Sequence, residues 1–248
     1  MQKDLTDKIA LVTGSAHRVG RVIALELAKQ GANIMVHYRS ASDDAVRDTL
    51  HDIKSYGVDA FSIQADVSTQ EGVETIFNTV KEHFGKLDIL VNSASVFHQN
   101  TLMDVSLEDW QQSLAVNVTA PFLCTQAAAR MMTENAPSGG AIVNILDYGA
   151  IRPWKDRVDH NVSKAALAML TRVSALSLGG DNIRVNGVIP GPVLKDAGHN
   201  DDSWQKTGEA LPIGRTGEPE DVGRAVVYLV REDFITGTLL EVNGGEHL

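Results

Sequence analysis

Residues 9–20, IALVTGSAHRVG, join a short apolar run directly to a glycine-containing turn. The run Ile9 to Thr13 has the length and composition of a buried strand, and helical spacing begins after the turn. A glycine turn between a strand and a helix presents free backbone N–H groups, which can bind a pyrophosphate. Only Gly14 and Gly20 are present, so the three-glycine fingerprint is incomplete. A turn that only packs the strand against the helix is therefore an equal alternative.

The rest of the chain repeats this alternation of short apolar runs and longer amphipathic stretches. The predicted strands are 9–13, 33–38, 60–64, 87–92, 141–146, 183–188 and 238–242, and the predicted helices lie near 19–30, 43–56, 71–84, 107–134, 160–178 and 219–231. Several runs are apolar without clean alternation, as in strands that helices cover on both faces. The pattern predicts a three-layer, doubly wound (Rossmann) α/β fold with a seven-stranded parallel sheet.

The length of 248 residues is sufficient for one large core, and no linker or composition shift separates a second unit. We therefore expect a single domain over 1–248. The one long irregular stretch is 190–217, and a loop of that length in a compact domain is more often functional than a filler. It is predicted to be a substrate loop.

Charge and cysteine content exclude several classes of protein. The net charge of −10 repels a phosphate backbone, which argues against nucleic-acid binding. Cys124 is the only cysteine, so no internal disulfide or thiolate zinc cluster can form, and the histidines show no metal-ligand spacing. The first apolar run is too short for a signal peptide or membrane span. We expect a cytoplasmic protein without a metal and without a membrane anchor.

The end of the second predicted strand indicates which dinucleotide would bind. An NAD enzyme is expected to carry an acidic residue there, to hold the ribose 2′-hydroxyl. This chain has Arg39 and Ser40 instead, with His17 and Arg18 on the glycine loop. A guanidinium suits a 2′-phosphate, which favours NADP(H). The alternative is that Arg39 is a solvated residue that balances the acidic residues at 43–44.

Taken together, seven motifs resemble the short-chain dehydrogenase/reductase family. They are TGSAHRVG (13–20), Asp66-Val67, VNSAS (91–95), Asn117 in LAVNVTAPF, Lys164 in SKAAL, IRVNGVIPGPV (183–193) and GTLLEVNGG (237–245). Within that family, Arg18 in the glycine loop, HYRSA (37–41) and NSAS (92–95) look like the pteridine reductase branch. Phe97 falls where that branch stacks an aromatic ring on its pterin. The resemblance thus implies a pterin-like substrate held by Arg18 and Phe97.

The resemblance also implies which residues hold the cofactor. Gly14, Ser15, Arg18 and Val19 would line the pyrophosphate, Arg39 and Ser40 the 2′-phosphate, Asp66 and Val67 the adenine, Asn92 and Ala94 the riboses, Lys164 the nicotinamide ribose, and Pro190, Gly191 and Val193 the carboxamide.

The catalytic positions depart from the family pattern. The family places a tyrosine four residues before the lysine and a serine thirteen residues before that tyrosine, and Asn117 would complete the tetrad. Counting back from Lys164 gives His160 and Asp147. An aspartate at the latter position has a precedent in the pteridine reductase branch. His160 and Lys164 share a helix face, and two like charges about 5 Å apart cost about 3 kcal/mol at an effective dielectric near 20. That cost disfavours the imidazolium form of His160. The negative charge of Asp147 acts in the opposite direction and favours it.

Three interpretations follow. The first is an NADPH-dependent reductase of a carbonyl or imine, with Asp147 and His160 as the proton relay and Lys164 as the cofactor anchor. The second is a cofactor-binding sensor, subunit or scaffold of the same fold with weak or lost catalysis. The third makes Tyr148 the donor, although its side chain would point away from Asp147 if the strand continued.

Other expectations concern the surroundings of the site. Trp154 and Trp204 are predicted to lie in loops near the cleft, although aromatic residues are more often core or interface anchors. The partner is expected to be a small-molecule substrate. By analogy with the family, the chain is expected to form a homo-oligomer, a dimer or tetramer, through the helices at 107–134 and 160–178 and the C-terminal strand.

Overall fold

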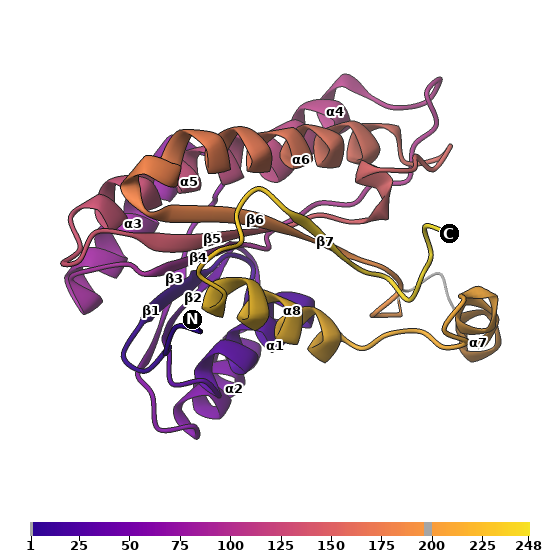
Figure 1. Cartoon of the computed structure of the whole chain (residues 1–248). Coiled ribbons are helices and arrows are strands. Elements are labelled where there is room, and N and C mark those ends of the chain that lie inside the picture. Colours follow the sequence, from indigo (N-terminus) through magenta and orange to yellow (C-terminus); the bar gives the residue numbers. More distant parts are fainter. Residues whose placement is uncertain (1, 196–199) are drawn as a thin grey trace.

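The computed structural model describes residues 2–195 and 200–248, and its centre is a parallel sheet with helices on both faces (Figure 1). Within these ranges seven strands run in the order β3-β2-β1-β4-β5-β6-β7, and every neighbouring pair is parallel. The strands are β1 (Ile9–Val12), β2 (Asn33–Tyr38), β3 (Ala60–Gln64), β4 (Ile89–Asn92), β5 (Gly140–Ile145), β6 (Ile183–Pro190) and β7 (Leu239–Val242). The predicted three-layer, doubly wound fold is confirmed.

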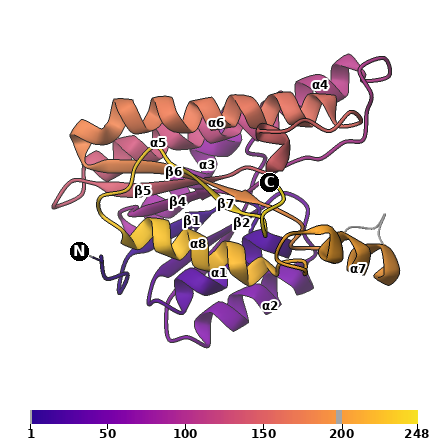
Figure 2. The same ribbon diagram turned by 45° about the vertical axis from the view of Figure 1, so that its right-hand side comes forward.

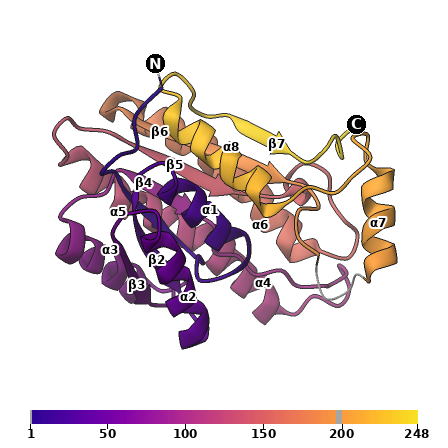
Figure 3. The ribbon, with the colours of Figure 1, turned by 90° about the horizontal axis from the view of Figure 1, so that it is seen from below.

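The helices form the two outer layers. They are α1 (Arg18–Ala28), α2 (Asp43–Lys54), α3 (Gln70–Phe84), α4 (Leu107–Leu114), α5 (Ala120–Thr133), α6 (Val158–Leu178), α7 (Asp201–Ala210) and α8 (Pro219–Arg231). Figures 1 and 2 show α5 and α6 above the sheet and α1 and α8 below it, and Figure 3 shows α1, α2 and α8 in front of the strands. Among the described residues, no helix is both long and apolar enough to cross a membrane.

The core is divided by the sheet because successive strand residues point to opposite faces. In β1, Ala10 and Val12 pack on the side of α1 and α8, whereas Ile9 and Leu11 pack on the side of α3 and α5. All eight residues of β6 are buried. This double burial explains why the strands are apolar runs rather than alternating ones.

Two segments differ from the sequence prediction. The helix expected over 107–134 is divided by a π-helical turn at Ala115–Thr119, a feature that often marks functional sites in helices. The stretch 190–217, expected to be irregular, contains α7, which begins after Asn200, whose side chain accepts a hydrogen bond from the backbone N–H of Ser203. Trp204 therefore lies on a helix rather than a loop. Residues 196–199 of this stretch, including His199, lie outside the described residues.

The strand order creates the position of the site. From β1 the chain passes to β2 on one side, whereas β4, on the other side of β1, begins the second half of the sheet. A crevice forms at the carboxyl ends of the strands where the winding direction reverses. Helix α1 packs closely there, because a Cβ on Gly20 would lie 2.3 Å from the carbonyl oxygen of Gly14. Gly20 is therefore required for this helix–turn contact.

Candidate active site

A cleft opens at the carboxyl ends of β1, β2 and β4. Of the residues predicted to bind a cofactor, it is lined by Gly14, His17, Arg18, Val19, Arg39, Ser40, Asp66, Val67 and Ala94. These residues come from four separate stretches of the sequence, and the parallel sheet brings them to one edge. That these residues bind a cofactor stays a prediction.

The glycine loop at the start of α1 keeps a glycine-like backbone. Gly14 has φ 67° and Arg18 has φ 56°, both in the left-handed region. The backbone of a residue other than glycine is strained in this region, so the conformation of Arg18 has an energetic cost. A Cβ on Gly14 would lie 3.0 Å from the Cα of Ala94, which shows how closely this turn approaches the segment after β4.

His37 anchors this loop from β2, a role the sequence analysis did not assign. Its Nδ1 accepts a hydrogen bond from the backbone N–H of Gly14 at 3.1 Å, so its Nε2 carries the proton and donates to the Ala65 carbonyl oxygen at 3.1 Å. The ring is 1 % exposed, and burial lowers the pKa of His37 to about 4. The neutral imidazole thus joins the ends of β1, β2 and β3.

Arg39 and Ser40 lie at the β2 side of the cleft. The Arg39 guanidinium is 3.9 Å from the Asp66 carboxylate, and its side chain is 48 % exposed. Of the acidic pair at 43–44, Asp44 forms its ion pair with Arg47. Arg39 lines the cleft, where its guanidinium can donate to a ligand.

The donor set of this cleft fits a dinucleotide phosphate. The loop before α1 supplies backbone N–H groups at a helix N-terminus, close packing at Gly14 leaves no Cβ in the way, and Arg39 offers a guanidinium. A 2′-phosphate carries the negative charge that this guanidinium can pair with.

Asp147 and His160 form a hydrogen-bonded couple beyond the end of β5. His160, on α6, points Nε2 at the Asp147 carboxylate and Nδ1 at the Val96 carbonyl oxygen, 3.0 Å away. A carbonyl oxygen can only accept, so Nδ1 carries a proton, and Nε2 shares its hydrogen bond with the Asp147 carboxyl group. The Asp147 side chain is 22 % exposed, whereas that of His160 is 2 % exposed. The exposed member of the couple is the carboxylate.

Lys164 lies one helical turn after His160 and is buried. Its ammonium donates to the Ile145 carbonyl oxygen at 2.9 Å. Burial lowers the pKa of Lys164, and the charge of Asp147 opposes that change. For Asp147, burial acts to raise the pKa, but the hydrogen bond from His160 and the charge of Lys164 outweigh it and hold the pKa below its ordinary value. The couple and Lys164 therefore behave as one electrostatic unit.

Asn117 supports this unit from the π-helical turn. Its Nδ2 donates to the Val96 carbonyl oxygen at 3.1 Å and to Ser163 Oγ at 3.0 Å, while its Oδ1 accepts from the Val96 N–H at 3.0 Å. Asn117 thus fixes the same carbonyl that holds His160. This use of the Val96 backbone could not be read from the sequence, because any residue type supplies it.

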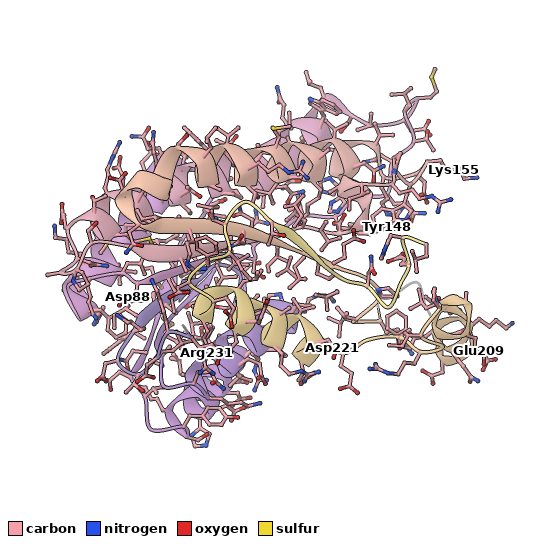
Figure 4. The ribbon with its side chains drawn as sticks, viewed as in Figure 1. Asp88, Tyr148, Lys155, Glu209, Asp221 and Arg231 are labelled. Carbon is pink, nitrogen blue, oxygen red and sulfur yellow. The ribbon has the colours of Figure 1, made fainter. Side chains whose placement is uncertain are left out.

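Aromatic rings lie beside the couple. Phe97 packs edge-on against His160 with ring centroids 4.5 Å apart, and the Arg157 guanidinium lies 4.8 Å from the Phe97 ring centroid. Trp154 contacts both Phe97 and Tyr148. Figure 4 shows Tyr148 at the opposite end of the sheet from Asp88. Tyr148 begins a 3₁₀ turn after β5 has ended, is 6 % exposed, and is packed on Trp154.

Some predicted site residues do not line the cleft. Ser15 is fully buried and donates to the Val12 carbonyl oxygen at 2.6 Å. Asn92 is also buried and donates to Asn144 Oδ1 at 2.8 Å. Both side chains instead hold the strand ends together. Gly191 and Val193 line a neighbouring cavity formed with the C-terminal segment, and Pro190 is the last residue of β6.

Among the described residues, no three histidine, cysteine, aspartate or glutamate side chains converge as metal ligands would. The absence of a metal stays a prediction.

Comparison with known proteins identifies the family. The model of the enoyl-(acyl carrier protein) reductase family matches residues 14–247. The chain is 37 % identical over 251 residues to glucose 1-dehydrogenase 2 of Bacillus subtilis, with 99 % of this chain and 96 % of that protein covered. It is 34 % identical over 252 residues to 3beta-hydroxysteroid dehydrogenase 1 of Eggerthella lenta, with coverage of 99 % and 95 %.

A solved structure agrees with these relatives. L-sorbose reductase from Gluconobacter frateurii, complexed with NADPH and L-sorbose, superposes with a TM-score of 0.91 at 31 % identity and covers 99 % of this chain and 98 % of its own. The chain therefore belongs to the short-chain dehydrogenase/reductase family, whose members are oxidoreductases.

Proposed function

We propose that this protein is an NADPH-dependent oxidoreductase that reduces a carbonyl or imine of a small molecule by hydride transfer. The observation that carries the proposal is the presence, at one sheet edge, of a phosphate-compatible cleft with Arg39 at its rim and of the couple formed by Asp147 and His160. The sorbose reductase neighbour is complexed with NADPH, which agrees with the same cofactor here.

The cleft residues have distinct roles in this proposal. The loop from Gly14 to Val19 would hold the pyrophosphate, Arg39 and Ser40 the 2′-phosphate, and Asp66 and Val67 the adenine. Lys164 would hold the nicotinamide ribose. The bound dinucleotide would supply the hydride. A guanidinium contact to a phosphate is charge-assisted and therefore favours NADPH over NADH.

Proton delivery is the task of the chain's own residues. Asp147 is the more exposed member of the couple, so a substrate oxygen or nitrogen would meet its carboxyl group first. His160 lies behind it with Nδ1 fixed on Val96, which orients Nε2 toward Asp147. A proton would pass from Nε2 through the Asp147 carboxyl to the substrate. The charge of Lys164 stabilises the Asp147 carboxylate that remains after transfer, and a proton from solvent would then restore the couple.

Two narrower interpretations from the sequence can be weighed. A pterin-like substrate would use Phe97, whose ring is 52 % exposed beside His160, together with Arg18 in the cleft. It stays a prediction from the motifs, since the relatives named above are called glucose, hydroxysteroid and sorbose enzymes. The cofactor-binding protein without catalysis is not favoured, because those relatives are named as oxidoreductases and a titratable couple is retained.

A fluorescence titration with NADPH and NADH tests the cofactor. We expect NADPH to bind at least tenfold more tightly, about 1.4 kcal/mol, at physiological salt. Arg39→Ala should remove most of that preference, and Arg47→Ala, which removes an arginine paired with Asp44, serves as the matched control. Equal dissociation constants for the two dinucleotides would refute the choice of cofactor.

A turnover screen of pterins, quinones, sugars and ketosteroids tests the substrate class. Phe97→Ala is measured alongside the wild type, because this variant should raise KM only for substrates with a flat ring.

We also propose that the chain forms a homo-oligomer in a reducing compartment. On α6, Met169, Val173 and Leu176 are 57 %, 51 % and 87 % exposed, and Phe122 on α5 is 44 % exposed. Such an apolar face on two neighbouring long helices is typical of an interface. Sedimentation of the wild type and of Leu176→Glu tests this, since a monomeric wild type would contradict it.

A further inference from the structure

The segment that follows β4 carries two groups of the candidate site on consecutive residues. The Val96 carbonyl oxygen accepts hydrogen bonds from His160 and Asn117. Phe97 is 52 % exposed, and its ring packs edge-on against His160. Residues 93–99 lie in neither a helix nor a strand, so the hydrogen bonds of regular secondary structure do not fix them. Their placement therefore depends on the contacts of individual residues.

The next residue, His98, is bound to helix α6 through Asp159. Its Nδ1 lies 3.1 Å from Asp159 Oδ2, and Ser113 Oγ on α4 donates a hydrogen bond to the same oxygen. The Asp159 side chain is fully buried, whereas the His98 side chain is 25 % exposed. Figures 1 and 2 show α4 beside α6. A buried carboxylate between two packed helices thus holds the side chain of a loop residue.

This carboxylate is not what packing alone would select. Burial acts to raise the pKa of Asp159, but the hydrogen bonds from Ser113 and His98 outweigh it and hold the pKa below its ordinary value. A carboxylate only accepts, so His98 Nδ1 is the donor. Oδ1 of Asp159 is buried and has no hydrogen-bond partner among the described residues, which costs about 1–3 kcal/mol. An apolar side chain would avoid that cost, so a role beyond stability is indicated.

The attachments to α6 lie on both sides of the exposed ring. Asp159 and His160 are consecutive residues of α6, and they hold His98 and Val96, the two neighbours of Phe97. Each residue has only two soft backbone dihedrals, so a residue whose two neighbours are both anchored has little freedom to turn. The ring direction is therefore set from one turn of α6.

The two ends of this short segment are not secured equally. Asn117 accepts from the Val96 N–H and donates to its carbonyl oxygen, so Val96 has a further anchor. At the other end, the Asp109 carboxylate is 3.9 Å from His98 Nδ1, too far for a hydrogen bond. The direction of the ring between these ends therefore depends chiefly on the contact between His98 and Asp159.

We propose that Asp159 is a positioning residue that acts through His98 and sets the Phe97 ring beside His160. The inference rests on the proposed function, because it concerns the surroundings of the same candidate catalytic couple. Phe97 is the exposed ring that a flat substrate would contact, and its edge-on packing confines the His160 ring. Asp159 is buried and acts through the residues that it holds.

Nuclear magnetic resonance of the protein with labelled histidine and bound NADP⁺ tests this placement. The π electrons of Phe97 shift the carbon-bound proton resonances of His160, and Phe97→Leu removes that shift and supplies the reference. His160→Gln identifies the resonances. We expect Asp159→Ala to lose most of the shift that depends on Phe97. His98→Ala should lose as much, and the double variant no more, because both substitutions remove one contact.

Two substitutions serve as controls. Asp109→Asn removes a carboxylate that lies near His98 without bonding to it, so the shift should stay unchanged. Asp159→Asn removes the charge but keeps an oxygen that accepts hydrogen bonds, so it should retain most of the shift. Equal losses in Asp159→Asn and Asp159→Ala would assign the effect to charge rather than to placement and would overturn the inference.

The inference is also overturned if Phe97→Leu does not change the His160 resonances, or if His98→Ala leaves them as in the wild type. His98 is partly exposed, so His98→Ala decides the question even where Asp159→Ala does not fold. NADPH binding is titrated for the wild type and each variant. A wild type that does not bind NADPH marks failure of the proposed function, whereas normal NADPH binding with an unchanged shift in His98→Ala marks failure of this inference alone.

Discussion

The two halves of the candidate site follow the family pattern to different degrees. At the cofactor half, Arg18 stands where the resemblance predicts a glycine, and it adopts φ 56°, in the left-handed region. At the catalytic half, His160 and Asp147 stand where the resemblance predicts a phenol and a hydroxyl, and they form a hydrogen-bonded couple. Backbone N–H groups can bind phosphate whatever side chain a residue carries, so a site of this kind tolerates a changed side chain. Proton transfer depends on the length and protonation state of one side chain, so a substitution there changes the chemistry.

The largest expected effect is on the catalytic half. Asp147→Asn and His160→Gln should each lower turnover of a neutral carbonyl substrate by about 10²–10⁴-fold, the usual contribution of general acid catalysis. The double variant should fall no further than the worse single variant, because the two residues act as one unit. Steady-state kinetics measure turnover, and an NADPH titration measures cofactor affinity, which should hardly change.

Tyr148→Phe is the control for that experiment, because Tyr148 is buried against Trp154 and is not the exposed member of the site. A large loss of turnover in Tyr148→Phe would restore Tyr148 as the donor. If His160→Gln changes little while His160→Tyr creates activity, the catalytic half is a relic and the protein is a cofactor-binding protein.

An intermediate effect is expected at the cofactor half, through His37. Its pKa is about 4 in the folded protein and 6.5 ordinarily, so between these pH values the unfolded chain binds the extra proton. The contribution of neutral His37 to the free energy of unfolding is therefore complete above pH 6.5. It declines as the pH falls toward 4, by about 3 kcal/mol in total. Urea unfolding at several pH values measures the slope. His37→Gln should flatten it, and an unchanged slope in that variant would contradict the assignment.

The smallest expected effect separates strain from binding within the glycine loop. Arg18→Gly should raise the free energy of unfolding by roughly 1 kcal/mol, because glycine adopts φ 56° without strain, while NADPH affinity falls with the lost guanidinium. Arg18→Ala removes the same guanidinium but keeps the strained backbone. It should weaken NADPH binding without any gain in stability. Denaturant unfolding of both variants distinguishes these outcomes, and equal stabilities would exclude strain at this position.

Much of the fold was predictable because it depends on local pattern. The apolar run at 9–13 and the glycines at 14 and 20 indicated the β1–α1 unit, and strands covered on both faces are recognisable as unbroken apolar runs. Helix α7 was missed because its stretch is polar, with no apolar face that a core requires. The π-helical turn at Asn117 was missed because it depends on tertiary contacts with Val96 and Ser163.

The sequence by itself determined the family, the parallel α/β architecture and the residue types at the cleft, because these depend on hydrophobic period, turn residues and motif spacing. Only the tertiary structure decided how those residues act. It turned Asn92 and Ser15 inward, joined Gly14 to His37, and buried His160 behind a more exposed Asp147. It also packed Glu246 of the C-terminal segment against Gly191, which follows β6. Distances between side chains on different strands and loops follow from packing of the whole sheet, which no local pattern encodes.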